Sequence, residues 1–537
     1  MAEMRNIDVL ILGGGINGCG TFRDLCAQGV DCLLLERSDF CSGASAGSSR
    51  LMHGGLKYLE TGEFRLVRES AEERNRLLRN AAHYVSPLPS VLPVRSRLGG
   101  ILPSILRFFG MKAALNDRGH LITRLGLTLY DLYGRRFRAL PRHRMLSRRQ
   151  LERTVPGLDR GIVGAGLYYE GQISHAERLG LELVLDGEAM NPGSRALNHV
   201  TIEGQADGIV TYSHDGVRHR VRPRIIINAG GAWIDSVNAA IGLDSKLMGG
   251  SKGAHLVIEN DRLLQALNGH MVYFGTADGR VNLVYPFMGR VLVGSTDIRI
   301  DDPDQAQCSD AEADYLRGVV AEIFPDIPVT ADQIRHRFSG VRPLPRADGD
   351  IGMVTRDHCI ARLALPAGTP VLCLIGGKWT TFRRFSEQAS DEVLRQLDRP
   401  RQASTDNMPI GGGKDFPDAG TRADWVAECA RSAGISPLRA ESLLHRYGTR
   451  ARLIAMELGK DTPLAFLPDY SREELEWLIR HERVGCVDDL LYRRTAIGIS
   501  GLLDQQVRTE INDIYQEASL HEAGLDTCFK TPADALP

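Results

Sequence analysis

The sequence predicts an α/β fold that contains an inserted mixed region and ends in a helical domain. Its first segment reads as strand, tight turn, helix and strand, with apolar runs at Ile7–Leu12 and Cys32–Leu35 and a helical stretch that ends near Gly29. A further strand at 224–228 and an apolar run at 371–375 again lead into glycine turns. The chain thus returns several times to an α/β region.

The remaining segments indicate what surrounds that sheet. Strand-like alternation with turns runs through 249–300, and a linker rich in Pro and Gly at 400–418 precedes helical periodicity. The predicted helices of that last part include Pro437–Tyr447, Arg450–Leu458 and Arg472–Arg480, followed by a polar tail after about Gln516.

Length and composition describe an ordinary multidomain globular protein. The 537 residues imply roughly three or four domains, and 43% hydrophobic and 25% charged residues exclude disorder, collagen and coiled coil. The formal charge is −2, the ten cysteines form no CxxC pair, and no apolar run reaches the ~18–20 residues of a membrane-spanning helix. We therefore expect a cytoplasmic protein with reduced thiols and without a metal site.

A dinucleotide-binding fingerprint follows the first strand. Gly13, Gly15 and Gly18 form a GxGxxG pattern between strand and helix, where absent side chains let the backbone approach a pyrophosphate at the helix N-terminus. Glu36 ends the next strand, where its carboxylate can accept hydrogen bonds from both ribose hydroxyls. An ordinary glycine-rich turn is the alternative, and the fingerprint alone does not distinguish NAD from FAD.

The segment after the second strand favours FAD. Residues 42–60, SGASAGSSRLMHGGLKYLE, resemble the same part of FAD-dependent glycerol-3-phosphate dehydrogenases. Further motifs of that family follow in order over almost the whole chain: Asn228–Trp233, Lys252–His255, Gly294–Asp297, Ser339–Leu344, Thr355–Asp357 and Gly376–Arg383, with weaker similarity at His481–Glu482 and Arg493–Thr495. We expect a split FAD-binding domain at 1–94, 155–240 and 340–400, a basic insertion at 95–154, an α+β substrate or cap region at 241–339, and a helical C-terminal domain at 401–537.

The resemblance and the residue chemistry together give the expected cofactor residues. Serine hydroxyls can donate to phosphate oxygens, glycines let the main chain lie against a flat ring, and a cation at a helix N-terminus would stabilise reduced flavin. The set is Gly13, Gly15, Asn17, Gly18, Glu36, Ser45, Ser48, Ser49, His53, Gly54, Gly55, Ala229, Gly230, Trp233, Gly376, Gly377, Lys378, Thr380 and Thr381. A polar surface loop at 42–60 and a solvated Lys378 are the alternatives.

A phosphorylated polyol requires forked donors, because its phosphate carries a charge of about −1.5 to −2. The family pattern selects Arg342 and Arg356 as the phosphate clamp and places Lys57 and Tyr58 near the flavin ring. Solvated or ion-paired arginines are the alternative for both.

Oxidation of the polyol also requires an acceptor for the hydroxyl proton. His255 is the preferred acceptor of the C2 hydroxyl proton as hydride leaves for flavin N5, because imidazole titrates near neutral pH. His53 competes for this role, Lys378 belongs to the same catalytic group, and a core histidine bonded to the main chain is the alternative for His255.

The strongest charge asymmetry lies between Arg95 and Arg153. Thirteen Arg and one Lys face two Asp and one Glu there, which leaves +11 within a chain of net −2. Apolar pieces such as Ile101–Phe109 interrupt the basic residues, which is typical of a segment that meets an anionic membrane surface. Nucleic acid binding and plain solvated surface are the other interpretations.

The sequence thus predicts a flavoenzyme attached to the cytoplasmic face of the inner membrane. The resemblance implies oxidation of sn-glycerol 3-phosphate to dihydroxyacetone phosphate, with electrons passed to ubiquinone or menaquinone, and is compatible with a homodimer. Another polyol phosphate, such as an erythritol phosphate, is the near alternative for the substrate. A distant alternative is an FAD-containing protein that modifies tRNA, although we expect no nucleic acid partner.

Overall fold

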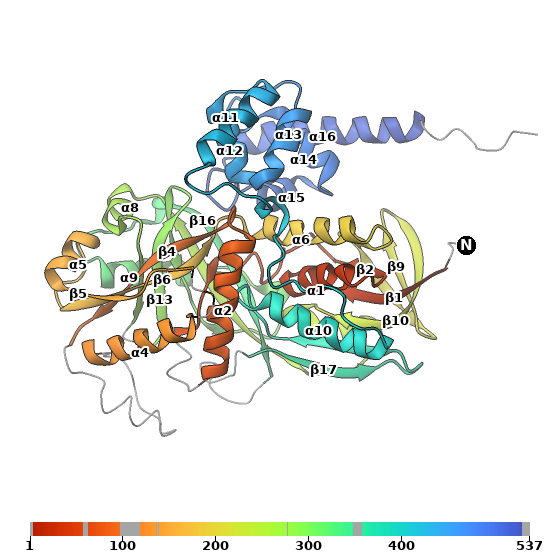
Figure 1. Cartoon of the computed structure of the whole chain (residues 1–537), viewed down its shortest axis with the longest axis horizontal. Coiled ribbons are helices and arrows are strands. Elements are labelled where there is room, and N and C mark those ends of the chain that lie inside the picture. The colour runs from red at the N-terminus through yellow and green to blue at the C-terminus, as the bar shows by residue number, and fades with distance from the viewer. Residues whose placement is uncertain are drawn as a thin grey trace, which may run out of the picture.

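The fold combines two sheets that pack side by side with a helical domain above them (Figure 1). The computed structural model describes residues 4–56, 63–96, 119–135, 137, 139–276, 278–346 and 357–528, with side chains up to residue 520. The predicted α/β architecture with a helical C-terminal domain is confirmed.

The first sheet has the strand order β17-β18-β10-β1-β2-β7, and β9 joins β10 to β8. Neighbours in the run β18-β10-β1-β2-β7 are parallel. Strand β17 pairs antiparallel with β18, and β9 pairs antiparallel with β10. The strands are β1 (Met4–Leu12), β2 (Cys32–Leu35), β7 (Arg195–Leu197), β8 (Thr201–Ala206), β9 (Ile209–His214), β10 (Val217–Asn228), β17 (Cys359–Ala364) and β18 (Pro370–Ile375).

Helices cover this sheet because its strands are apolar on both faces. Along β1, Val9 and Ile11 pack into one buried cluster while Leu10 and Leu12 pack into another on the opposite face. The first cluster lies under α1 (Ile16–Ala27), α6 (Ala176–Met190) and α10 (Phe382–Leu397), and α7 (Ile234–Ala240) contributes to the second.

The second sheet has the order β15-β11-β14-β13-β12-β4-β6-β3, with β16 paired to β11 and β5 to β6. Its strands are β3 (Leu51–Met52), β4 (Val85–Val94), β5 (Arg144–Ser147), β6 (Gly164–Ile173), β11 (Met248–Ile258), β12 (Met271–Gly275), β13 (Val281–Phe287), β14 (Arg290–Gly294), β15 (Ile298–Arg299) and β16 (Ile334–Pro345). The helices that accompany it are α2 (Phe64–Asn80), α4 (His120–Tyr133), α5 (Arg148–Thr154), α8 (Asp261–Leu267) and α9 (Asp310–Ile323).

Strand pairing joins segments that we expect in different domains. Strands β4 and β6 come from segments assigned to the FAD-binding domain, yet they pair with each other and with β12 and β5 in the second sheet. Strand β5 belongs to the predicted basic insertion, and β16 also crosses the boundary expected at residue 340. Alternation of apolar residues identifies a strand, but its partner depends on packing between distant segments.

The C-terminal domain is a helical bundle with its own apolar core. It comprises α11 (Arg422–Ala433), α12 (Pro437–Tyr447), α13 (Ala451–Glu457), α14 (Arg472–His481), α15 (Val487–Asp489), a π-helical turn at Leu490–Arg494 and α16 (Gln505–Cys528). Helix α16 thus continues through residues expected to form a polar tail after Gln516, because Glu517, Ala518 and Leu520 are good helix formers.

Buried ion pairs attach this bundle to the first sheet. The Arg178 guanidinium on α6 donates to both carboxylate oxygens of Glu482 at 2.7 and 2.9 Å, and both side chains are almost fully buried. At the edge of the interface, His199 Nε2 lies 2.7 Å from Asp489 Oδ2, which also accepts the Gly485 N–H at 2.8 Å. Cys486 lies beside this pair, and these groups fix the position of the domain.

Candidate functional site

A cavity of about 780 Å³ opens where the carboxyl ends of three parallel strands meet. Leu12 of β1 pairs with Asn228 of β10, which pairs with Cys373 of β18, so the chain leaves all three strands at one edge. Ligands bind at this edge of doubly wound sheets, because the strand-to-helix turns there expose main-chain groups. The second sheet closes the cavity from the other side through β11 and β16.

The turn between β1 and α1 brings bare main chain to the cavity. Gly13 has φ +108°, and a Cβ there would lie 2.7 Å from the Ala229 carbonyl oxygen. At Gly18 a Cβ would lie only 1.9 Å from the Gly13 carbonyl oxygen, whereas at Gly15 it would meet only Ser45 Oγ at 3.5 Å. Gly13 and Gly18 therefore allow the turn to form, while the space at Gly15 belongs to the cavity.

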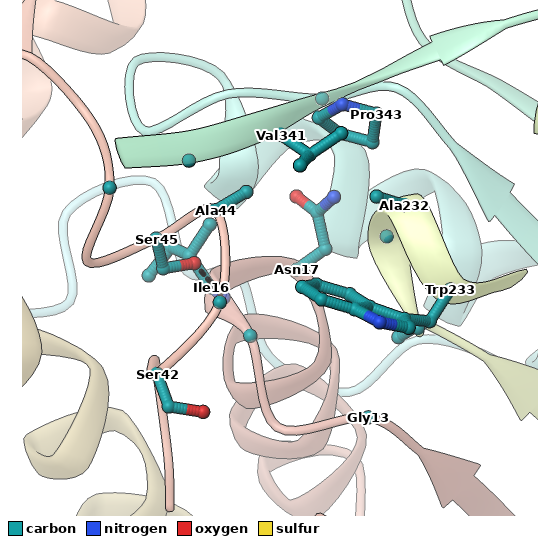
Figure 2. A pocket seen from close by; sticks show the side chains of 18 of the residues that line it. Gly13, Ile16, Asn17, Ser42, Ala44, Ser45, Ala232, Trp233, Val341 and Pro343 are labelled. Atoms are coloured by element: carbon teal, nitrogen blue, oxygen red, sulfur yellow. Dashed lines mark hydrogen bonds between the residues drawn. The ribbon is translucent and has the colours of Figure 1, made fainter. Parts of the chain in front are cut away.

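The 36–49 loop lies across the start of α1. Ser45 Oγ accepts the Ile16 N–H at 3.0 Å, and the Trp379 indole donates to the Ser45 carbonyl oxygen at 3.0 Å. Figure 2 shows the first of these bonds and the Asn17 side chain, which points across the cavity toward Val341 and Pro343. The loop is thereby fixed against the helix N-terminus.

At the start of this loop, Glu36 accepts main-chain donors with both oxygens. Its Oε2 accepts the Gly14 N–H at 2.6 Å, and its Oε1 accepts the Ser38 N–H at 2.8 Å. Burial raises the pKa of the Glu36 carboxyl. Each carboxylate oxygen has a further lone pair, so hydroxyl donors can still bind from the cavity side.

The turn after β18 provides a second stretch of exposed main chain. Gly376 and Gly377 have φ values of +78° and +85°, and a Cβ at Gly377 would lie 2.6 Å from the Asn17 amide nitrogen. Asn17 Nδ2 donates to the Gly376 carbonyl oxygen at 3.0 Å, which joins the two turns. Lys378 and Thr380 follow in the cavity lining.

His255 lies on β11 at the second-sheet side of the cavity. Its Nε2 is 2.7 Å from Ser49 Oγ, its Nδ1 is buried without a hydrogen-bond partner, and its ring stacks on Phe338 with centroids 4.9 Å apart. Burial, with the nearby cations Arg342 and Arg50, lowers the pKa of His255 to about 3. The imidazole is therefore neutral at physiological pH.

Arg342, on β16, is fixed by hydrogen bonds from both of its terminal nitrogens. Its Nη1 donates to Ser251 Oγ and Asp297 Oδ1, each at 3.1 Å. Its Nη2 donates to Ser295 Oγ at 2.9 Å and to the Thr296 carbonyl oxygen at 3.1 Å. The guanidinium is thus a positioned cation at the cavity wall, beside the Ser295 hydroxyl and the Ser251 hydroxyl, which donates to Asp297.

The structure brings most of the predicted residues together. Those that line the cavity are Gly13, Gly15, Asn17, Glu36, Ser45, Ser48, Ser49, His53, Ala229, Gly230, Trp233, His255, Arg342, Gly376, Gly377, Lys378 and Thr380. Gly18, Gly54, Gly55 and Thr381 do not line it; the Gly54 N–H instead donates to the buried Glu170 carboxylate at 2.9 Å. Lys57, Tyr58 and Arg356 lie outside the described residues.

Several lining residues were not predicted. Ser42 and Ala44 belong to the 42–60 segment, and Val341 and Pro343 to the Ser339–Leu344 motif, so the motifs themselves were the available signal. Arg493 comes from the C-terminal domain and belongs to the Arg493–Thr495 segment of weaker family similarity, which gave it no role in the cavity.

The cavity fits FAD on chemical grounds. It offers bare main chain at Gly15, the Ser45, Ser48 and Ser49 hydroxyls and a helix N-terminus, which together suit an anionic pyrophosphate. Asn17 Oδ1 is also buried there without a hydrogen-bond partner. The volume of the cavity lies within the ~300–1,000 Å³ that is typical of ligand pockets.

Comparisons with known proteins agree with this interpretation. Residues 8–382 match the family described as FAD dependent oxidoreductase, and residues 403–518 match the C-terminal domain of alpha-glycerophosphate oxidase. Over 524 residues the chain is 34% identical to a glycerol-3-phosphate dehydrogenase of Synechocystis sp., covering 92% of this chain and 89% of that one. It is 30% identical over 512 residues to D-erythritol 1-phosphate dehydrogenase of Brucella abortus, covering 92% and 95%.

A solved structure has the same fold over the whole chain. Glycerol-3-phosphate dehydrogenase from Bacillus halodurans, complexed with FAD, superposes with a TM-score of 0.73 at 22% identity and covers 100% of this chain and 97% of that one.

Proposed function

The chain belongs to the FAD-dependent glycerol-3-phosphate dehydrogenase family, and we propose that it oxidises sn-glycerol 3-phosphate to dihydroxyacetone phosphate and passes the electrons to ubiquinone or menaquinone. The chain is an FAD-dependent dehydrogenase of glycerol 3-phosphate or a related polyol phosphate. The observation that carries the proposal is the pairing of a fixed guanidinium, Arg342, with a neutral buried imidazole, His255, in one cavity.

The main-chain side of the cavity would hold the cofactor. Gly13, Gly15 and Asn17 would bind the pyrophosphate, Glu36 the ribose, and Ser45 with its neighbouring serines the phosphate or ribityl oxygens. When bound, FAD supplies the acceptor for the substrate's hydride at N5. Lys378, after its glycine pair, places a cation in the cavity that favours the more negative, reduced state.

Arg342 would bind the substrate phosphate together with nearby hydroxyls. A phosphate oxygen can accept from this guanidinium in place of Ser251 or Ser295. The Ser295 hydroxyl can then donate to the same phosphate, whereas the Ser251 hydroxyl donates to Asp297. A dianion bound here also cancels the positive potential of the guanidinium at the His255 ring.

His255 would accept the C2 hydroxyl proton. Its neutral ring has a lone pair to accept with, and a phosphate dianion beside Arg342 would raise its basicity toward the value that proton transfer requires. The balance is then complete, since the proton goes to imidazole while the hydride goes to the cofactor. His53 also lines the cavity and remains the competing acceptor.

A panel of polyol phosphates tests the proposal. Holoenzyme is mixed anaerobically with glycerol 3-phosphate, erythritol phosphates and unphosphorylated glycerol, and bleaching of the flavin absorbance is followed. We expect glycerol 3-phosphate to bleach the flavin fastest and glycerol to fail. Faster bleaching by D-erythritol 1-phosphate would assign that substrate, as the similarity to the Brucella enzyme allows. Bleaching by none of them would reject the function.

We also propose that α4 touches an anionic membrane surface, where the quinone dissolves. Leu121, Leu125 and Leu132 lie on one helical face and are 56%, 62% and 57% exposed. Exposed arginines that form no ion pair within the described part of the chain occur on α4 and in the residues that follow it: Arg124, Arg135, Arg142, Arg144, Arg149 and Arg153. Apolar side chains bordered by arginines are typical of a segment that lies in a lipid interface.

The described residues contain no helix that could span a bilayer. Helix α4 lies at the edge of the molecule opposite the C-terminal bundle (Figure 1). Sedimentation with anionic vesicles tests the contact: Leu121, Leu125 and Leu132 changed to Ser together should weaken binding, whereas Leu438→Ser, in the bundle and 79% exposed, should not. Equal binding of both variants would reject it.

A further inference from the structure

The C-terminal domain contributes one described side chain to the cofactor cavity, that of Arg493. All other described lining residues precede Asp398, whereas Arg493 lies far along the chain, in the π-helical turn Leu490–Arg494. The side chain is half-buried, and its Nε is buried without a hydrogen-bond partner. A helical domain that packs on a cofactor site thus places a cation inside it.

The next residue fixes this turn to the cavity wall. The buried Arg494 guanidinium donates to Asp39 Oδ1 at 3.0 Å and to the carbonyl oxygens of Glu482 and Arg483 at 2.6 and 2.8 Å. Asp39 belongs to the 36–49 loop that lines the cavity. Because Arg494 is tied to both domains, the backbone of Arg493 is positioned relative to the ligand site.

The π-helical turn directs the side chains of two consecutive arginines, Arg493 and Arg494, to different places. The Thr495 N–H bonds to the Leu490 carbonyl oxygen, five residues back, at 2.9 Å, and Thr495 Oγ1 donates to the same oxygen at 2.7 Å. Turns of this kind are rare and occur often at functional sites, since they redirect side chains that a regular helix would space by 100°. Arg494 enters the domain interface, and Arg493 enters the cavity.

Arg493 differs from the other arginines of the cavity. Arg37 pairs with Asp304 at 2.8 Å and Arg342 with Asp297 at 3.1 Å. Arg493 makes no hydrogen bond or ion pair within the part of the chain that the structure describes. A partly desolvated guanidinium without an anion raises the free energy of the protein, and an oxyanion in the cavity would remove that cost.

We propose that Arg493 binds a phosphate oxyanion inside the cavity and so makes the C-terminal domain part of the ligand site. Two phosphates can reach it, the pyrophosphate of FAD and the phosphate of the substrate. The inference rests on the proposed function only for the second of these, because FAD binding follows from the family. Docking of the bundle and retention of the phosphate ligand then support each other.

The test compares Arg493→Gln and Arg493→Lys with Arg431→Gln, which removes the same charge from an exposed position on α11. Three quantities are measured: the Kd of FAD for deflavinated protein, the KM of glycerol 3-phosphate for the FAD-loaded enzyme, and the melting temperature. Loss of a hydrogen bond to a charged group corresponds to roughly 10- to 150-fold in affinity. Lysine keeps the positive charge but lacks the paired N–H donors of the guanidinium. Arg493→Lys should therefore lose less affinity for the phosphate ligand than Arg493→Gln.

The outcomes separate the two phosphates. A Kd for FAD at least tenfold higher in Arg493→Gln assigns the pyrophosphate, and a KM at least tenfold higher with FAD affinity unchanged assigns the substrate. The proposal is overturned if both constants stay within twofold of wild type, or if Arg431→Gln changes them as much. If wild type oxidises no polyol phosphate, the proposed function fails, while the FAD measurement still decides the role of Arg493.

Discussion

The two sides of the cavity present different kinds of groups to the ligand, main-chain groups on one side and side chains on the other. On the side of the first sheet, main-chain groups of the Gly13–Asn17 and Gly376–Gly377 turns face the ligand, and the glycines are needed for backbone approach. On the side of the second sheet, the wall consists of side chains such as His255 and Arg342. Main-chain groups recognise a cofactor that is always the same, whereas side chains can change with the substrate and carry protons.

This difference predicts that changes on the two sides affect different measurements. Disturbing the main-chain side should change the affinity for FAD. Disturbing the side-chain side should change turnover or the KM of the substrate and leave the FAD content alone.

The largest effect is expected at His255. Without a proton acceptor at the C2 hydroxyl, His255→Asn should slow flavin reduction by about 10²- to 10⁴-fold, the usual contribution of general acid–base catalysis. Anaerobic stopped-flow measures this step directly, and the flavin content should match wild type. His53→Asn is the matched comparison, because His53 lines the same cavity. If His53→Asn is the slower of the two, the proton acceptor is His53.

The next effect concerns two glycines of one motif. Gly15→Val should raise the Kd of FAD about 100-fold, as expected when two charge-assisted hydrogen bonds are lost, with the melting temperature of deflavinated protein nearly unchanged. Gly18→Ala should instead lower that melting temperature, because its Cβ would lie 1.9 Å from the Gly13 carbonyl oxygen. Titration of FAD and thermal unfolding measure the two effects. Equal loss of stability in both variants would contradict the distinction.

The same contrast explains what could be predicted from the sequence. The main-chain side follows from contiguous patterns: an apolar run, a GxGxxG turn and an acid at the next strand end predicted β1, α1, β2 and the position of Glu36. The second side is assembled from β11, β16 and Arg493, which are hundreds of residues from the first turn, and only family motifs indicated Arg342 and His255.

The features that the sequence does not predict depend on long-range contacts. Strands β4 and β6 were recognised neither as partners of each other nor as members of the second sheet, because pairing depends on burial by distant segments. The approach of Arg493 depends on buried pairs such as Arg494 with Asp39, which join residues 455 positions apart. A local pattern cannot encode such a contact.

A smaller effect is expected at the phosphate clamp. Arg342→Ala should raise the KM of glycerol 3-phosphate roughly 10- to 100-fold through loss of charged hydrogen bonds. Arg337→Ala, on the same strand but paired with the exposed Asp310, is the control and should change KM less than twofold. Arg342→Lys keeps a cation beside Asp297 and should fall between them. Steady-state kinetics at saturating quinone measures all of these, and an unchanged KM in Arg342→Ala would remove it from the substrate site.

The smallest effect is on acid stability, and it belongs to the side-chain side because main-chain groups do not titrate. The pKa of His255 is lowered to about 3 and that of His336 to about 4, chiefly by burial. Below the ordinary histidine pKa of ~6.5 the unfolded chain binds protons that the folded protein does not, so stability falls as pH falls through that value. His255→Asn removes one of these groups and should flatten the fall.

Between pH 7 and pH 5 the loss of folding free energy due to His255 amounts to about 2 kcal/mol. In a chain this long, that corresponds to at most a few degrees in the melting temperature. The stability contribution of His199 changes with pH in the opposite direction. Its hydrogen bond to Asp489 raises its pKa, so its contribution is present below ~6.5 and is lost as pH rises through the folded value. Melting curves of deflavinated protein from pH 5 to 9 should therefore show His255→Asn gaining on wild type at the acid end and His199→Asn losing there. Parallel curves for His255→Asn and wild type would mean that His255 binds as many protons in the folded protein as in the unfolded chain, so that burial does not lower its pKa.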